Sequence, residues 1–208
     1  MEFERELHEI LPADLPNRDV VVQKGAAHLA LIVEANRHFN LTRITSPREA
    51  AIKHILDSVV PWRLFAAAGH VLDAGTGAGF PGIPLALVLP DIRFTLAESI
   101  QKKARFVEGA LASLELPNVT IAAQRAEDLF KGVDIITARA LAPVSRALDL
   151  FAPALKRGVK VLLYKGPDAA REIEESAAVS RRLRVEIKVV LTYDLPEAMG
   201  TRTIIQIG

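Results

Sequence analysis

The first sixty residues carry apolar side chains at the spacing of amphipathic helices. Within residues 19–38, for example, one helical face is formed by Leu29, Ile32, Val33 and Asn36, because residues three and four positions apart are neighbours on a helix. This face is therefore expected to pack inward. The opening part of the chain is predicted to be helical.

A second helix is predicted over residues 47–60. Residues 46–49 have the sequence of a capping box, with proline at the first helical position, and Pro61 is expected to end the helix. The hydrophobic pattern changes soon afterwards. We expect residues 1–62 to form a helical extension that packs on a core domain, residues 63–208.

Beyond residue 69, short apolar runs alternate with longer amphipathic segments. This alternation predicts an α/β fold of the Rossmann-like type, in which a mainly parallel sheet has helices on both faces. The segments at residues 101–116 and 143–155 are long enough to be helical crossovers. The seven predicted strands, of which the last two close the sheet, are residues 71–74, 94–98, 119–123, 134–138, 159–164, 185–191 and 203–207.

The most informative segment is residues 71–82, which joins the first strand to a loop with four glycines. Glycine lacks a Cβ atom, so it adopts positive φ easily and lets a ligand approach the backbone. A helix that follows such a loop offers unpaired N–H groups. The loop predicts a nucleotide-type cofactor near Gly75, Gly77 and Gly79, whereas the alternative is an ordinary glycine turn before a helix.

Two classes of cofactor compete for this loop. Residues 77–82 match the dinucleotide pattern G-x-G-x-x-G, and Glu98 ends the next strand about 20 residues on. Asp73, however, ends the first strand, where a carboxylate would hold an ammonium group but repel a pyrophosphate. Pro81 and Pro84 also lack N–H donors that a pyrophosphate would use. The loop therefore favours S-adenosylmethionine, which carries an ammonium group, over the cofactor of a nicotinamide oxidoreductase.

Polar residues follow the next strands, at the edge where such sheets bind ligands. Glu98 is placed to accept hydrogen bonds from ribose hydroxyls. Glu127 or Asp128 is placed to meet an adenine amino group, although acids are also favoured in the first turn of a helix. Arg139 follows the fourth strand among small residues and could grip a phosphate or a carboxylate with two hydrogen bonds. Lys165 adds a positive charge after the fifth strand.

Composition narrows the class of protein. Half of the residues are apolar, enough for a sizeable core, and no apolar run reaches membrane-spanning length. A net charge of +1 indicates no strong field for nucleic acid. Because there is no cysteine, disulfides, thiolate metal sites and cysteine nucleophiles are excluded, and no metal site is expected. The acidic N-terminus lacks an apolar segment, so we expect a cytoplasmic protein, and we expect a monomer.

Asn40, His54, Asp57 and Ser58 form a further polar set in the helical part. A histidine, an aspartate and a serine invite comparison with a hydrolase triad, but Ser58 lacks a nucleophile elbow and follows His54 on the same helix. We expect instead a polar helical face that lines the site, or a structural hydrogen-bond network. His54 fits either role.

Taken in order, these motifs resemble the RsmG (GidB) family of bacterial small-subunit ribosomal RNA methyltransferases. The resemblance covers most of the chain from Asn40 onward, while the first forty residues match poorly and Ala78 stands where the family often has proline. The motifs that carry it are Asn40-Leu41-Thr42, residues 54–58, residues 73–83, Glu98-Ser99 with Lys102-Lys103, Arg139-Ala140, Lys165-Gly166 and Arg202.

The resemblance implies a class I methyltransferase that moves a methyl group from S-adenosylmethionine to N7 of one guanine in the decoding region of 16S ribosomal RNA, within the small subunit or its precursor. Guanine N7 has a free lone pair and no proton, so the reaction needs alignment rather than a base. The implied cofactor contacts are Gly75, Phe80, Ala126, Glu127 and Arg139. The implied functional polar residues are Asn40, His54, Arg125, Arg139, Lys165 and Arg202.

Two other functions stay open from the sequence: methyl transfer to a small molecule or a protein, and RNA binding by a non-catalytic assembly factor. A substrate cavity closed over by the N-terminal helices would favour the former, and RNA binding without methyl transfer the latter. An RNA substrate also needs a cationic path across the surface. The residues expected to line that path are Arg37, His38, Arg43, Arg48, Lys53, His54, Arg125, Arg139, Arg146, Lys165 and Arg202.

Overall fold

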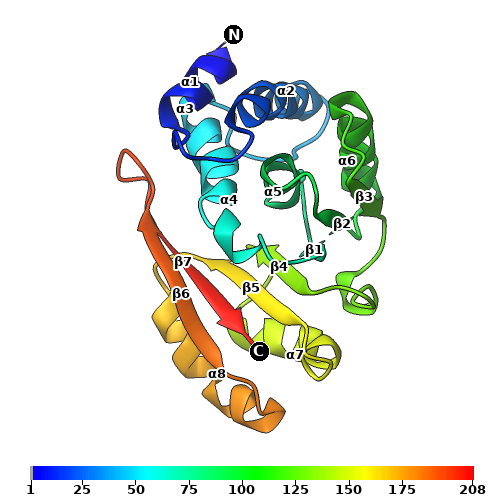
Figure 1. Cartoon of the computed structure of the whole chain (residues 1–208), viewed down its shortest axis with the longest axis vertical. Coiled ribbons are helices and arrows are strands. Elements are labelled where there is room, and N and C mark those ends of the chain that lie inside the picture. Colours follow the sequence, from blue (N-terminus) through cyan, green and yellow to red (C-terminus); the bar gives the residue numbers. More distant parts are fainter. Residues whose placement is uncertain (1) are drawn as a thin grey trace.

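A computed structural model of the chain describes residues 2–208 and contains one seven-stranded sheet (Figure 1). The strand order is β3-β2-β1-β4-β5-β7-β6. The first five strands are parallel, and β7 runs antiparallel to both of its neighbours, β5 and β6. The strands are β1 His70–Ala74, β2 Arg93–Ala97, β3 Val119–Ala122, β4 Ile135–Arg139, β5 Lys160–Lys165, β6 Ile187–Asp194 and β7 Thr201–Ile207. The predicted α/β, mainly parallel fold is confirmed.

Helices cover both faces of the sheet, because successive side chains of a strand point to opposite faces. In β1, Val71 belongs to a core shared with the N-terminal helices, α5 and α6, whereas Leu72 belongs to a second core with α7 and α8. The helices are α1 Glu2–Ile10, α2 Arg18–Asn36, α3 Pro47–Ala50, α4 Asp57–Val59, α5 Gly82–Val88, α6 Gln101–Leu114, α7 Val144–Leu155 and α8 Ala169–Leu183, with short 3₁₀ turns at Trp62–Leu64 and Ala126–Asp128.

The N-terminal helices lie on the α5 and α6 side of the sheet, where α2 contacts both of these helices (Figure 1). Leu7 of α1, Leu29 of α2 and Ile204 of β7 belong to one continuous apolar core. The predicted inward face of α2 is confirmed at Leu29 and Ile32, which are buried, whereas Val33 is half-buried. The division of the chain at residue 62 stays a prediction.

The predicted helix over residues 47–60 differs from expectation in two ways. Ser46 occupies the N-cap position, but its side chain makes no capping hydrogen bond, so the predicted capping box is wrong. Its other member, Glu49, instead accepts a hydrogen bond from Lys53 Nζ at 2.7 Å, a pairing that i,i+4 spacing favours. The segment is also not one α-helix, because a π-helical turn, Ala51–Leu56, separates α3 from α4. In this turn the Asp57 N–H bonds to the carbonyl of Ile52, five residues back.

Element ends shifted by a few residues elsewhere. Strand β2 stops at Ala97, so Glu98 follows the strand instead of ending it, and β6 extends to Asp194.

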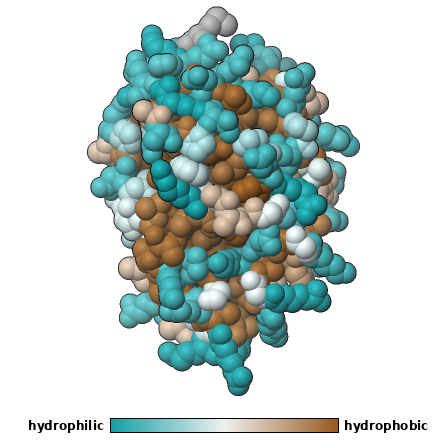
Figure 2. All heavy atoms as spheres, in the orientation of Figure 1, coloured by the Kyte–Doolittle hydropathy of each residue, from teal (hydrophilic) through white to brown (hydrophobic). Residues whose placement is uncertain are grey.

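Within residues 2–208, no helix is long and apolar enough to cross a membrane. On the face shown in Figure 2, hydrophilic side chains dominate the upper and lower parts, and apolar atoms gather at mid-height.

Candidate active site

The glycine loop connects β1 to α5. Gly75, Gly77 and Gly79 have φ values of 71°, 63° and 100°, which residues with a Cβ atom rarely adopt. A Cβ atom at position 75 would lie 2.7 Å from Leu141 Cδ1, and one at position 79 would lie 2.5 Å from Ile83 Cδ1. Space above Gly77 is open, with no atom within 4 Å of a Cβ position. The loop thus needs glycine for its backbone and leaves room for a ligand over Gly77.

Asp73 lies beneath this loop and is fully buried. Its Oδ2 accepts hydrogen bonds from Thr76 Oγ1 at 2.6 Å and from the Gly82 N–H at 2.9 Å, so it fixes both ends of the loop. Burial raises the pKa of Asp73 to about 6. Its Oδ1 has no hydrogen-bond partner in the described chain, and this oxygen is the one left for the predicted contact with an ammonium group.

A first cavity, of about 340 Å³, opens at the carboxyl ends of β1, β2 and β3. Predicted cofactor residues Gly75, Ala126 and Glu127 line it together with Arg125, whose side chain is 76% exposed and lies 3.8 Å from the Glu127 carboxylate. Glu98 is buried beside the glycine loop. Its two oxygens accept hydrogen bonds from the N–H groups of Gly77, at 3.1 Å, and Ile100, at 2.8 Å.

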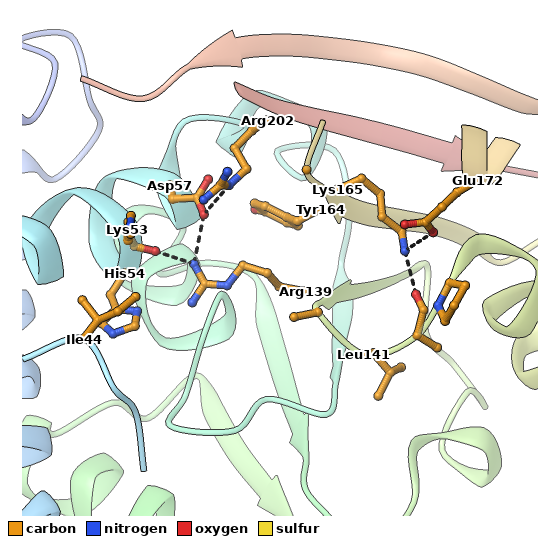
Figure 3. Close-up of a pocket in the computed structure, with 14 residues that line it drawn as sticks. Ile44, Lys53, His54, Asp57, Arg139, Leu141, Tyr164, Lys165, Glu172 and Arg202 are labelled. Carbon is orange, nitrogen blue, oxygen red and sulfur yellow. Dashed lines mark hydrogen bonds and ion pairs between the residues drawn. The ribbon is translucent and has the colours of Figure 1, made fainter. Parts of the chain in front are cut away.

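A second cavity, of about 670 Å³, opens on the other side of Leu141 and Ala142, two residues that line both cavities. Its wall combines side chains from β4, β5, β7 and the π-helical turn (Figure 3). The structure therefore brings four predicted functional residues to one cavity: His54, Arg139, Lys165 and Arg202.

Two arginines of this cavity meet on one buried carboxylate, that of Asp57 (Figure 3). Arg139 Nη1 lies 3.3 Å and Arg202 Nε 3.2 Å from Asp57 Oδ2, while the Tyr193 hydroxyl donates to Asp57 Oδ1 at 2.9 Å. Arg139 Nη1 also donates to the carbonyl oxygen of Lys53 at 2.8 Å. That carbonyl belongs to the π-helical turn, and such turns are frequent at functional sites.

Lys165 is not a free cation. Its Nζ donates to Glu172 Oε2 of α8 at 2.7 Å and to the carbonyl oxygen of Ala142 at 2.6 Å. The same Glu172 oxygen accepts the N–H of Val144, the first residue of α7, at 2.8 Å. Lys165 thus anchors the wall between the two cavities to α8.

His54 is buried in an aromatic stack. Its ring lies 4.6 Å from that of Phe80 at an interplanar angle of 7°, and His28 packs on Phe80 at 4.8 Å. The Arg139 guanidinium carbon lies 5.3 Å from the centre of the Phe80 ring. Burial lowers the pKa of His54 to about 3, with the Arg139 charge adding to the shift, so the imidazole is neutral near pH 7. Phe80 itself lines neither cavity and supports Arg139 from behind.

Two polar residues of the N-terminal part lie elsewhere. Asn40 is exposed in the loop between α2 and α3 and lines neither cavity. This loop is held by Asn36, which bonds to the backbone of residues 41–42. The Ser58 hydroxyl donates to the backbone carbonyl of His54, so the two side chains do not form a hydrolase pair.

Several cations of the predicted RNA path are held in ion pairs. Arg48 binds Glu6 at 3.0 Å and Glu197 at 2.7 Å, which joins α1 to the turn between β6 and β7. Within residues 2–208, Arg43 and Arg146 are exposed and form no ion pair. The cationic path itself stays a prediction.

Comparison with known proteins decides the family. The family model described as rRNA small subunit methyltransferase G (GidB) matches residues 22–197. The chain belongs to this family. A ribosomal RNA small subunit methyltransferase G from Solibacter usitatus is 62% identical over 209 residues, covering 100% of both chains. Another member of the family, from Carboxydothermus hydrogenoformans, is 35% identical over 192 residues, covering 88% of this chain and 81% of the relative.

Solved structures with low sequence identity to this chain share its fold. An O-methyltransferase from Bacillus cereus in complex with SAH has a TM-score of 0.60 at 17% identity, over 98% of this chain and 96% of that chain. The O-methyltransferase TomG from Streptomyces achromogenes, in complex with SAM, has a TM-score of 0.57 at 18% identity. The match covers 86% of this chain and 88% of that chain. The predicted class I, Rossmann-like architecture is confirmed.

For this family member, the sequence analysis missed the partners of the predicted cations. The sequence predicts for Asp57 a polar helical face or a structural hydrogen-bond network but no particular partner, and it gives no signal for Glu172 or Tyr193. The spacing gives no direct signal for them, since Asp57 and Arg202 are 145 residues apart. The one usable signal is that Asp57 is a charged residue with apolar neighbours at Ile55, Leu56 and Val59, which predicts a buried partner.

Proposed function

We propose that this chain transfers a methyl group from S-adenosylmethionine to N7 of a guanine in 16S ribosomal RNA. The observation that carries the proposal is the pair of cavities that share Leu141 and Ala142: one touches the glycine loop and the other is lined by cations. The cavities meet at the junction of β1 and β4, where the strand order reverses direction, and open α/β sheets bind ligands at this point. Membership of the methyltransferase G family supports the same reaction.

The first cavity fits a nucleoside that carries a cationic sulfonium arm. Glu127 lines it, and two further acids lie buried at the glycine loop: Glu98, which accepts the Gly77 N–H, and Asp73, one oxygen of which has no hydrogen-bond partner within residues 2–208. When bound, S-adenosylmethionine supplies a methyl group activated by a sulfonium sulfur. We assign its binding to the predicted cofactor residues Asp73, Gly75, Gly77, Gly79, Phe80, Glu98, Ala126, Glu127 and Arg139. Of these, Gly75, Ala126 and Glu127 line the first cavity, and Arg139 lines the second.

Positioning is the main contribution of the protein to the reaction. Guanine N7 carries no proton, so no base has to act before the lone pair attacks. His54 therefore does not have to act as a base. Its imidazole is neutral near pH 7 and packs against Phe80 at the second cavity. Arg139 has a fixed place in the second cavity through Lys53 and Asp57, which suits it to orient the nucleotide.

The RNA substrate requires contacts beyond the cavity. Arg125 and Arg146 line the first cavity and are exposed, and Arg43 lies in the loop that also carries Asn40. We assign these residues to contacts with the RNA backbone, since phosphate contacts by cations position a nucleic acid without reading its sequence. That the protein acts as a cytoplasmic monomer stays a prediction.

The test is methylation of defined substrates. Purified protein is incubated with labelled S-adenosylmethionine and small ribosomal subunits, their precursors or naked 16S RNA from cells that lack the endogenous activity, and the labelled nucleotide is mapped by mass spectrometry. Label at one guanine N7 is expected, with a large loss for Arg139→Ala and none for Arg182→Ala, an exposed arginine on α8. Binding of the methyl donor and of RNA without any label would contradict the proposal and favour an assembly factor. Absence of both label and RNA binding would favour a small molecule or a protein as substrate.

A further inference from the structure

We propose that Glu172 is a positioning residue for methyl transfer, which acts through Lys165 and the N-terminus of α7 on the segment between the two cavities. This role rests on the proposed function. The segment consists of residues 140–142, named here the wall segment, and two of its residues, Leu141 and Ala142, line both cavities.

The wall segment lies alongside the expected path of the methyl donor. The predicted cofactor residues are divided between the cavities, since Gly75 and Ala126 line the first and Arg139 lines the second. A donor that contacts both groups must extend past the wall segment. Leu141 is 39% exposed, and its Cδ1 lies 2.7 Å from the position that a Cβ atom would take on Gly75. The position of Leu141 therefore determines the room for donor and acceptor where the cavities meet.

The backbone of the wall segment needs support from outside. Ala140 has a φ of 54°, in the left-handed region that residues with a Cβ atom rarely adopt. Such a conformation persists only where the surrounding structure holds it, and it is frequent at functional sites. Within residues 2–208, the wall segment belongs to no helix or strand and makes no backbone–backbone hydrogen bond. Its support therefore comes from side chains.

One oxygen of Glu172 supplies this support (Figure 3). Glu172 Oε2 accepts the N–H of Val144 at 2.8 Å and a hydrogen bond from Lys165 Nζ at 2.7 Å. Lys165 Nζ donates in turn to the carbonyl oxygen of Ala142 at 2.6 Å. The side chains of Lys165 and Glu172 are only 10% and 21% exposed, so these charge-assisted bonds are shielded from water. A change in the reach of Glu172 is therefore transmitted to Ala142 and to its neighbour Leu141.

Charge disfavours a direct contact between Glu172 and the RNA. A carboxylate repels phosphate groups, and the ion pair of Glu172 with Lys165 is neutral as a whole. Neither residue of the pair offers a net charge to the RNA backbone. Positioning is the role that the hydrogen bonds of Glu172 support.

The experiment compares two substitutions that separate reach from charge. Glu172→Gln removes the charge but keeps an oxygen at the same distance from the backbone, whereas Glu172→Asp keeps the charge and shortens the side chain by one methylene group. Glu174→Asp, at an exposed acid on the same helix, is the control. For each variant we measure methylation kinetics with small ribosomal subunits, the affinities for the subunits and for S-adenosylmethionine, and thermal melting.

Glu172→Asp should lower kcat about tenfold or more, since a misplacement of about 1 Å can reduce a rate about 100-fold. Its effect on either affinity should be smaller than its effect on kcat. Glu172→Gln should retain most of kcat, and the control should match the wild type. In a Lys165→Met background, Glu172→Asp should reduce kcat much less than it does alone, because substitutions within one hydrogen-bond network are not additive.

Two results would overturn the proposal. A lower melting temperature of Glu172→Asp with unchanged kcat would leave Glu172 with a structural role alone. A larger loss of kcat for Glu172→Gln than for Glu172→Asp would show that the charge of Glu172 matters and its reach does not.

A second readout follows the wall segment without turnover. NMR of protein with isotope-labelled leucine methyl groups should show close contact between Leu141 and Gly75 in the wild type and in Glu172→Gln, and a shifted Leu141 signal in Glu172→Asp. An unchanged Leu141 signal in Glu172→Asp would contradict the proposal. If the wild type fails to methylate the RNA, the proposed function fails, and the Leu141 signals still decide whether Glu172 positions the wall segment. If Glu172→Asp does not fold, Glu172→Gln decides, since its kcat and Leu141 signal must both stay close to those of the wild type.

Discussion

Gly82 is the position where replacing glycine by alanine should destabilise the glycine loop most, because the added methyl group has no room there. It is the first residue of α5 and is buried, and its backbone conformation is accessible to alanine. A Cβ atom there would overlap Leu96 Cδ2 and lie 2.8 Å from Asp73 Oδ2, the oxygen that accepts the Gly82 N–H. Gly82→Ala must therefore push apart two buried side chains that support the loop.

The magnitude follows from two opposing effects. Overpacking a core by a methyl group costs about 1–3 kcal/mol. Replacing glycine by alanine in a helix contributes about 0.5–1 kcal/mol in the other direction. Gly109 in α6 measures the second effect alone, because it is exposed and a Cβ atom there meets nothing within 4 Å. Relative to Gly109→Ala, Gly82→Ala should lose about 1–3 kcal/mol of unfolding free energy.

Thermal melting and calorimetric binding of S-adenosylmethionine provide the assay. For a protein of this size, about 1 kcal/mol shifts Tm by roughly 2–4 °C, so Gly82→Ala should melt roughly 2–12 °C below Gly109→Ala. Its affinity for the donor should also fall, because Asp73 loses its place under the loop. If the two variants melt together, the tight packing between Gly82, Leu96 and Asp73 is refuted.

Three further substitutions test other parts of the site. His54 has its pKa lowered to about 3 by burial, whereas an unfolded histidine titrates near 6.5, so the unfolded state gains protons first as pH falls and stability decreases toward acid. His54→Gln should reduce the loss of unfolding free energy between pH 7 and pH 5 by roughly 2 kcal/mol in urea titrations, and an unchanged pH dependence would be inconsistent with its burial. Lys165→Met should cost about 1–3 kcal/mol by leaving Glu172 unpaired, and adding Glu172→Gln should restore part of it; simple additivity in thermal melts would argue against the pair. Ser46→Ala should change stability by less than about 0.5 kcal/mol in the same melts, because Ser46 makes no capping bond, and a loss of about 1 kcal/mol would indicate a working cap.

The sequence predicted those parts of the structure that depend on residues close to one another in the chain. The glycine loop, the apolar strands and the inward face of α2 each follow from spacing within about twenty residues, and all appear in the structure. The grouping of His54, Arg139, Lys165 and Arg202 in one cavity is also consistent with the expectation that strand ends meet at one edge.

The sequence could not predict the ion pairs that neutralise the cations of the second cavity, Arg139, Lys165 and Arg202. Asp57 meets Arg202 only because β7 runs antiparallel beside β5, and Lys165 meets Glu172 only because α8 returns over the sheet. The π-helical turn was missed for a different reason: it changes backbone hydrogen bonds by one residue without changing the apolar pattern that predicts a helix.

The place of β7 in the sheet also determines the order in which the fold can be completed during synthesis. Within residues 2–208, strand β6 pairs only with β7, which is made after β6 although it lies between β5 and β6. While the chain is still being made, β6 has no neighbour to bond, and the second cavity lacks Arg202. A chain that stops before Thr201 would therefore leave both the edge of the sheet and the cationic wall unfinished, so synthesis of β7 couples completion of this edge of the sheet to completion of the cavity wall.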